Sequence, residues 1–223
     1  MAITTAVRSD TQIQADVLAE LKWDARVQPN EVGVSVKDGI VTLTGYVDSY
    51  TKKWAAEERA HRVAGVKAVA NDIQVRLPGS SERTDADLAA AARRALEWNT
   101  LVPADRVRIT VSSGFVTLEG DVDWQYERDA AERAVRNLVG VKGVSNLIRV
   151  KPNAMPQNIK ERIEQALRRI IEEDARSITV EVEGSKVILR GTVRSWAERQ
   201  EAERSAWSAP GITSVDNRIT ISY

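Results

Sequence analysis

The feature that most constrains this chain is a ten-residue pattern that occurs three times, at residues 38–47, 113–122 and 184–193. In each copy apolar residues alternate with polar ones, as in a β-strand with one buried face. A turn pair (Asp-Gly, Ser-Gly or Gly-Ser) opens each copy, so we expect the second strand of a β-hairpin in each. A chain that repeats one hairpin three times is predicted to be a repeat protein.

The repeat divides the 223 residues into three units of roughly 70 residues, a size at which one small core is just adequate. We place the units at residues 9–77, 84–150 and 156–223. Two composition breaks, each containing Pro, form linkers at residues 78–83 and 151–155. Because both linkers are short, we expect the units to pack on one another.

Alignment of the copies on the second glycine of the hairpin strand brings a whole unit into register. Before the hairpin, apolar residues step by four (Ile13, Val17 and Leu21 in the first unit), which predicts an amphipathic helix. Its plausible N-caps are Asp10, Thr84 or Asp85, and Asn158. A second helix is predicted after the hairpin, at about residues 49–64, 124–139 and 195–209.

A third strand with the pattern Val-x-Asn-x-Ile ends each unit, so the order of elements is α-β-β-α-β. The strand-helix-strand step is expected to be a right-handed crossover. The predicted fold class is therefore α+β, in which each module is a three-stranded mixed sheet with two helices on one face. The asparagines of this strand, Asn71, Asn146 and Asn217, are expected to form local hydrogen bonds.

Two glycines recur in each unit and are interpreted as backbone devices. The first lies in the hairpin strand, where glycine permits a bulge or a close approach, although it could instead line a ligand surface. The second follows 20 positions later and is expected at the C′ position of the second helix, which favours a left-handed conformation. The first set is Gly45, Gly120 and Gly191, and the second set is Gly65, Gly140 and Gly211.

The composition offers little catalytic chemistry. The chain has no cysteine and one histidine, His61, which excludes thiol nucleophiles, thiolate metal sites, disulfides and sites built from several histidines. Neighbouring carboxylates such as Glu57 and Glu58 point apart on a helix and do not form an acid-base pair. We predict no enzyme activity, no cofactor and no metal site.

Charge argues against nucleic acid as a partner. The chain has 32 Lys and Arg against 32 Asp and Glu, with neither a basic arm nor an acidic tail. Residues 140–143 spell the GxxG of a KH domain, but that loop joins two helices, whereas here it joins a predicted helix to a strand. We see neither a signal peptide nor a transmembrane segment and expect a cytoplasmic protein, or a periplasmic one if a leader is missing.

Tryptophan is the unusual signal, with six residues against one phenylalanine. Two fall outside the inner face of the second helix, two share one position near the end of the first helix, and two stand where the second helix begins. Tryptophan suits a membrane or protein interface, whereas the alternative is packing between units or against another chain. These candidate contact residues are, in that order, Trp54 and Trp207, Trp23 and Trp98, and Trp124 and Trp196.

The element order and the strand motif Gly-x-Val-Thr-Leu-x-Gly resemble the BON domain family. The resemblance covers nearly the whole chain three times, with the motif complete in the first two units, at residues 39–45 and 114–120. The third unit departs from it at Ser185 and Ile188. The resemblance implies a non-enzymatic module that is associated with osmotic or envelope stress and contacts anionic phospholipid or membrane.

Two other functions remain open beside that implication. Three rigid modules could form a cytosolic scaffold for protein partners or for self-association. A small-ion sensor is the other alternative, since backbone carbonyls can coordinate potassium without any side-chain signature. We further expect the third unit, with its departing strand and its alanine-lined helix, to depend most on its neighbours for stability.

Overall fold

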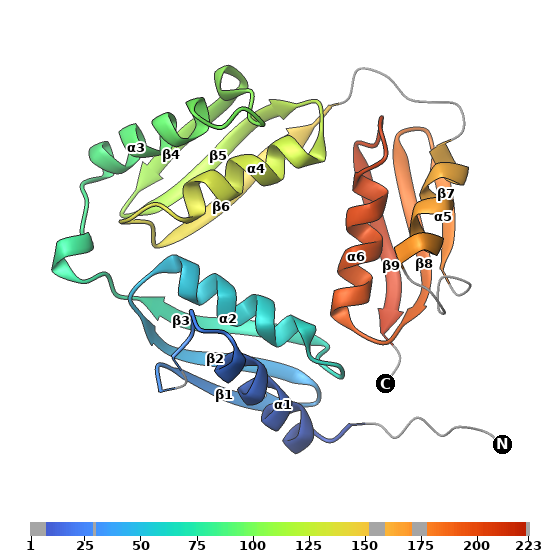
Figure 1. Cartoon of the computed structure of the whole chain (residues 1–223), viewed down its shortest axis with the longest axis horizontal. Coiled ribbons are helices and arrows are strands. Elements are labelled where there is room, and N and C mark those ends of the chain that lie inside the picture. The colour runs from blue at the N-terminus through green and yellow to red at the C-terminus, as the bar shows by residue number, and fades with distance from the viewer. Residues whose placement is uncertain (1–7, 29, 152–158, 171–177, 222–223) are drawn as a thin grey trace.

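The computed structural model describes residues 8–28, 30–151, 159–170 and 178–221 (Figure 1). Three modules with the same element order follow one another along the chain. In each module the central strand pairs antiparallel with the first strand and parallel with the third. Both helices of a module lie on the same face of its sheet (Figure 1). The α+β class and the three α-β-β-α-β modules predicted from the sequence are confirmed.

The elements have the following bounds. The first module contains α1 (Asp10–Trp23), β1 (Val32–Lys37), β2 (Ile40–Val47), α2 (Tyr50–Arg62) and β3 (Ala68–Val75). After η1 (Gly79–Ser81), the second module contains α3 (Asp85–Glu97), η2 (Ala104–Arg106), β4 (Val107–Ser112), β5 (Phe115–Val122), α4 (Gln125–Arg136) and β6 (Gly143–Val150). The third module contains α5 (Ile159–Ile170), β7 (Thr179–Glu183), β8 (Lys186–Val193), α6 (Trp196–Trp207) and β9 (Ser214–Ile221).

Each module has its own core between its sheet and its helices. The stripe of α1 is buried against the alternating residues of β2, of which Val41 and Leu43 are fully buried. The second helix contributes small residues instead, such as Ala56 and Ala60 in α2. Small side chains let this helix lie close to the sheet. The sequence periodicity predicts an inner face of Ala56, Ala60 and Val63 in the first module and its equivalents in the others; of these residues Leu138 and Ala209 are only partly buried and the rest are buried.

The first helix also holds the hairpin turn. The carboxylate of Asp10 accepts hydrogen bonds from the backbone N–H groups of Asp38 and Gly39 at 2.8 and 2.9 Å. Asp85 does the same for the turn of the second module. The prediction that Asp10 is the N-cap is therefore wrong, because the N-cap is Ser9, paired in a capping box with Gln12. Thr84 is the N-cap of α3, and Asn158 lies outside the described residues.

The hairpin-strand glycines make a close backbone approach possible. Gly45 has φ 129°, and a Cβ atom there would lie 2.1 Å from the carbonyl oxygen of Glu31. A Cβ atom on Gly120 would meet Arg106 in the same way, also at 2.1 Å. Gly191 shares this conformation, with φ 140°. A side chain at Gly45 or Gly120 would clash with backbone, and the positive φ shared by all three positions favours glycine, which gives these residues a structural role.

The second set of glycines lies beyond the helix end rather than at its C′ position. The second helices end at Arg62, Arg136 and Trp207. The glycines follow three or four residues later, in the turn before the last strand, with φ between 92° and 102°. The left-handed backbone was expected, but its placement at the helix C′ position is wrong. The three residues are Gly65, Gly140 and Gly211.

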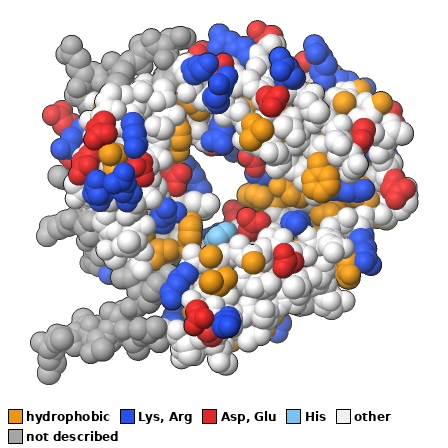
Figure 2. Space-filling model, turned by 180° about the vertical axis from the view of Figure 1, so that it is seen from behind, with side chains coloured by type: hydrophobic (Ala, Val, Ile, Leu, Met, Phe, Trp, Pro, Cys, Tyr) orange, Lys and Arg blue, Asp and Glu red, His pale blue; other side chains and the backbone are white. Residues whose placement is uncertain are grey.

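The three modules form a ring (Figure 1). The second helix of each module, α2, α4 or α6, lies on the inner side, and α1, α3 and α5 lie further out. Figure 2 shows the ring from behind, with an opening at its centre. Among the helices of the described residues, none combines the length and the apolar character needed to cross a bilayer.

Candidate functional site

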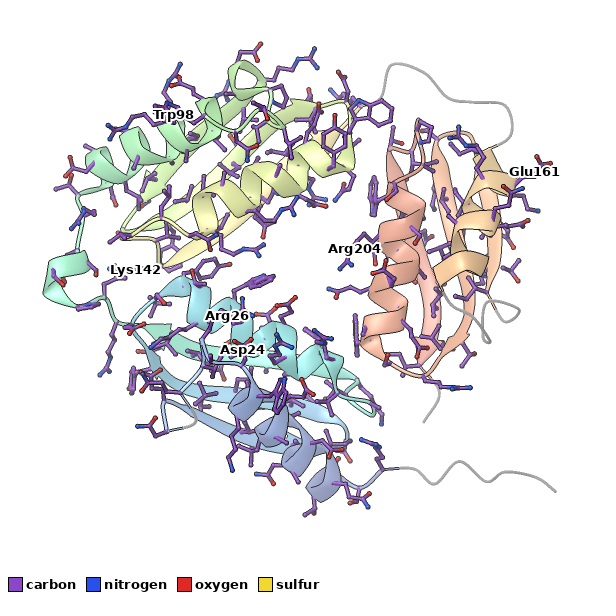
Figure 3. All side chains as sticks on the ribbon, in the orientation of Figure 1. Asp24, Arg26, Trp98, Lys142, Glu161 and Arg204 are labelled. Carbon is purple, nitrogen blue, oxygen red and sulfur yellow. The ribbon has the colours of Figure 1, made fainter. Side chains whose placement is uncertain are left out.

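The six tryptophans fall into two groups in the structure. Trp23 is the last residue of α1, and Trp98 is the C-cap residue that follows α3. The two side chains are 85% and 87% exposed. Figure 3 shows Trp98 beside α3 on the outer part of the ring, whereas Arg204 of α6 is directed toward its centre. A tryptophan this exposed contributes almost nothing to the core, so both rings are free to contact a partner.

Trp124 belongs to the exposed group and forms part of a larger apolar end of the second module. Its ring stacks on Tyr126, with centroids 6.3 Å apart, and both side chains are exposed. An ion pair of 2.9 Å between Arg106 and Asp123 holds the loop before β4 beside the start of α4. That loop carries the exposed Leu101. We call these exposed side chains of the second module the aromatic end; they are Trp98, Leu101, Trp124 and Tyr126.

Trp54 belongs to the other group and lies at the junction of the first and second modules. The guanidinium carbon of Arg136 on α4 stands 3.8 Å from the ring centroid of Trp54 on α2. Beside this cation–π contact, the Thr51 hydroxyl donates to the Asn137 side chain at 3.4 Å. Tyr50, at the start of α2, packs against the core of the second module.

Trp196 lies at the junction of the third and first modules. Its ring centroid is 5.0 Å from that of His61 on α2, and it packs against the core of the first module. From within its own module, the guanidinium carbon of Arg199 lies 4.7 Å from the Trp196 ring centroid. His61 is therefore an inter-module contact residue. No motif in the sequence pointed to such a role.

Trp207 lies at the junction of the second and third modules. It is half-buried and packs against the cores of both. For Trp54, Trp196 and Trp207 the structure therefore shows packing between units, which was the alternative to an exposed rim. Trp23, Trp98 and Trp124 stay available for an external partner.

The junctions use two equivalent positions of the second helices. In the gap-free alignment of the units, one position lies in the first turn of the second helix and another at or next to its last residue. The first-turn residue Tyr50 packs on the second module and the first-turn residue Trp196 packs on the first module, whereas Trp207, a last-turn residue, makes the contact between the second and third modules. The first-turn residues are Tyr50, Gln125 and Trp196, and the residues of the last turn are His61, Arg136 and Trp207.

Burial at these junctions shifts several titration equilibria. Burial raises the pKa of the Tyr50 hydroxyl and that of the Asp129 carboxyl on α4. Burial lowers the pKa of His61, against a smaller opposing effect from Glu57. Each shift disfavours the charged form. Burial is the largest cause in each case, so the shifts report packing.

One buried carboxylate lies away from the junctions. Asp24, just after α1, accepts hydrogen bonds from Arg26, at 2.6 and 2.9 Å, and from Arg59 of α2, at 2.8 Å (Figure 3). The hydrogen bonds from Arg26 hold the pKa of the Asp24 carboxyl well below its usual value, despite burial. Asn99 takes this position in the second module. The cluster stabilises a loop of the first module and exposes no reactive group.

The recurring asparagines form hydrogen bonds to the second helix as well as within their own strand. The Asn71 amide donates to the Glu57 carboxylate at 2.8 Å and to the Lys53 carbonyl of α2, while its oxygen accepts from the Ile73 N–H. The same contacts recur in the other modules through Asn146 with Glu132 and Asn217 with Glu203. The glutamates were missed from the sequence, although each stands 14 residues before its asparagine in every copy.

Metal binding gains no support from the part of the chain that the structure describes. No group of three or more His, Cys, Asp or Glu in that part is placed to hold a metal ion. The arrangement offers two kinds of surface instead. One is a set of exposed aromatic side chains on the first two modules, and the other is the set of junctions that closes the ring.

Comparison with known proteins agrees with the repeat. The BON domain family matches residues 9–76, 84–152 and 159–223. Osmotically-inducible protein Y of Escherichia coli (strain K12) is 31% identical over 146 residues, which cover 64% of this chain and 73% of that protein.

Among solved structures, the C-terminal domain of CdsD, a structural protein of the type III secretion system of Chlamydia trachomatis, has a TM-score of 0.26 and 11% identity, covering 97% of this chain and all of that one. A second CdsD structure has a TM-score of 0.24 and 12% identity, covering 93% of this chain and 91% of that one. TM-scores this low carry no argument about arrangement or function.

Proposed function

Because the chain belongs to the BON domain family, with three tandem copies of the domain, we propose that it is a non-catalytic binding protein of the osmotic or envelope stress response that docks on anionic phospholipid membranes. The relation to osmotically-inducible protein Y supports the link to osmotic stress. The single observation that carries the docking proposal is the pair of almost fully exposed tryptophans, Trp23 and Trp98, at equivalent positions.

An interfacial role accounts for the chemistry of these two positions. A tryptophan ring is apolar but carries one N–H donor, and this combination favours the boundary between lipid headgroups and acyl chains. The aromatic end adds three further side chains to Trp98, so the second module would make the larger contact.

Basic residues beside both tryptophans favour an anionic surface. Lys22 lies in the last turn of α1 and Arg94 in the last turn of α3, and both are exposed. Attraction to an anionic membrane is worth about 1 kcal/mol for each such residue near the surface. The chain as a whole has balanced charge, so binding would depend on these local residues and would weaken with added salt.

The first test measures binding to vesicles. Co-sedimentation and intrinsic fluorescence with anionic vesicles should show pelleting and a blue shift, with much weaker effects on zwitterionic vesicles. The double variant Trp23→Ala/Trp98→Ala should lose at least about tenfold in affinity, since burial of two large rings in the interface is lost. Phe115→Ala, which removes an exposed ring from the sheet face, is the matched control and should bind normally. Equal binding by the wild type and the double variant would contradict the proposal.

A protein-binding scaffold is the second candidate, and the composition of the aromatic end favours it. A stacked pair of exposed aromatic rings, Trp124 and Tyr126, resembles the anchor residues of a protein interface. Acidic residues, Asp123 and Glu127, stand in the same region and are unfavourable beside an anionic membrane. Absence of vesicle binding with an intact fold would make the scaffold the leading function.

A further inference from the structure

The junction between the first and third modules contains the only histidine of the chain. His61 sits near the end of α2 and is half-buried against the Trp196 ring of α6. This junction joins the two modules furthest apart in sequence, so its opening leaves the order of the chain and both linkers intact. It is the contact that turns a row of three modules into a ring.

Two buried polar atoms at this junction also lack hydrogen-bond partners. The Nδ1 atom of His61 and the Nε1 atom of Trp196 are both buried, and neither has a hydrogen-bond partner among the described residues. A buried polar atom without a partner costs about 1–3 kcal/mol, because it loses its bonds to water and gains nothing. The Trp196 ring makes packing contacts at this junction, with His61 and with the core of the first module, and a small change in free energy can open such an interface.

The other two junctions differ in chemistry. Arg136, at the equivalent position of the second module, also has a buried atom without a hydrogen-bond partner, Nε, but it keeps its charge at every accessible pH and pairs with Glu132 at 2.5 Å. Trp207, at that position in the third module, has no titratable group at all. Of the three equivalent positions, only His61 changes charge in the physiological range.

We propose that the contact between the first and third modules is a clasp that opens reversibly when His61 is protonated. In the closed ring the imidazole is half-buried, with its Nδ1 atom out of water, and lies against an indole. In the open ring it returns to solvent. A cationic imidazolium gains hydration when the clasp opens, whereas the neutral ring gains little, so protonation favours the open form.

The charges around His61 leave this balance in place. On its own helix, Glu57 attracts the imidazolium but is already bonded to Asn71. Across the junction, α6 places the cation Arg199 beside Trp196, where it disfavours a second positive charge. Arg62, next along α2, is exposed. The net effect follows burial, which lowers the pKa of His61 in the closed form.

The direction of the pH dependence follows from linkage. A base whose pKa is lower in the closed form binds fewer protons there than in the open form. Closure is therefore most stable above the ordinary histidine pKa of about 6.5 and weakens as the pH falls through that value. Opening uncovers Trp196, which adds an aromatic surface that the closed ring hides. This inference stands apart from the membrane proposal and does not require it.

The experiment uses the absence of cysteine in the chain, which allows clean labelling of engineered pairs. Ser35, Ser145 and Ser214 are exposed, and Ser→Cys is nearly isosteric. A dye pair in the Ser35→Cys/Ser214→Cys variant of the full chain reports the distance between the first and third modules. The Ser35→Cys/Ser145→Cys pair reports the junction of the first and second modules and serves as the control.

The expected result is a loss of energy transfer in the first pair between about pH 8 and about pH 5.5, with a midpoint near or below the ordinary histidine pKa. The control pair should not change. His61→Gln, which keeps the size but cannot titrate, should abolish the pH response, and Trp196→Ala should lower the transfer at every pH. An unchanged first pair overturns the proposal, and so does a pH response that persists in His61→Gln. Low energy transfer at about pH 8 in the Ser35→Cys/Ser214→Cys variant with His61 and Trp196 unchanged would also overturn the proposal, because the first and third modules would then not be in contact.

Discussion

The second and third modules share one fold and two tryptophans each, but they direct those side chains oppositely. Trp98 and Trp124 of the second module are exposed, whereas Trp196 and Trp207 of the third module lie in junctions. The large exposed hydrophobic residues follow the same division. Seven of them belong to the second module, and none belongs to the described part of the third: Trp98, Leu101, Phe115, Trp124, Tyr126, Val139 and Leu147.

This difference shows how a repeat protein divides tasks without changing its fold. The backbone devices are common to all modules, namely the strand glycine and the asparagine bonded to a glutamate of the second helix. The side chains at the ends of the helices differ from module to module. The second module uses them to present a surface, and the third uses them to close the ring.

The largest expected effect comes from separating the modules. Residues 84–150, expressed alone, should unfold cooperatively, since their core is complete within the module. Residues 152–223 alone should unfold at least about 10 °C lower, because Trp196 and Trp207 lose the surfaces that they pack against. Differential scanning calorimetry of the two fragments provides the measurement. If the two fragments unfold at the same midpoint temperature and with the same cooperativity, the expected difference in stability between the modules is contradicted.

A single substitution should reproduce part of this effect in the whole chain. Trp207→Ala removes a ring that packs against two cores and should destabilise the protein by about 2–3 kcal/mol in a urea titration. The matched control is Trp98→Ala, which removes an exposed ring and should change the free energy of unfolding by less than about 0.5 kcal/mol. If the two variants lose similar free energies of unfolding, the exposure of a tryptophan does not determine its contribution to stability, and the comparison between the modules fails.

The sequence predicts the fold of each module in detail but only part of the candidate site. Periodicity and the repeated glycines identify every strand and helix, since those patterns express contacts inside one module. The N-cap at Ser9 was misplaced by one residue because Ser9 and Asp10 are both capping types. A helical wheel shows that Trp54 faces away from its own core, but it cannot show that Arg136 of another module covers it.

The same limit explains the residues that were missed. Contacts between modules depend on their relative orientation, which no period in the chain encodes. His61 carries no motif and gains its interest only from Trp196, 135 positions away in the sequence. Glu57 was within reach of sequence reasoning, since its equivalents recur at a fixed spacing from the asparagines.

The smallest expected effect on stability would sharpen the comparison most. Trp98→Arg gives the second module the residue that the third has at the equivalent position, Arg169. Because Trp98 is 87% exposed, the free energy of unfolding should change by less than about 0.5 kcal/mol. Binding to anionic vesicles should nevertheless fall by about tenfold. The positive charge of the new arginine attracts anionic lipid less strongly than the tryptophan ring does when it is buried in the membrane interface. A variant that unfolds as the wild type does, yet still binds fully, would place the docking surface elsewhere on the ring.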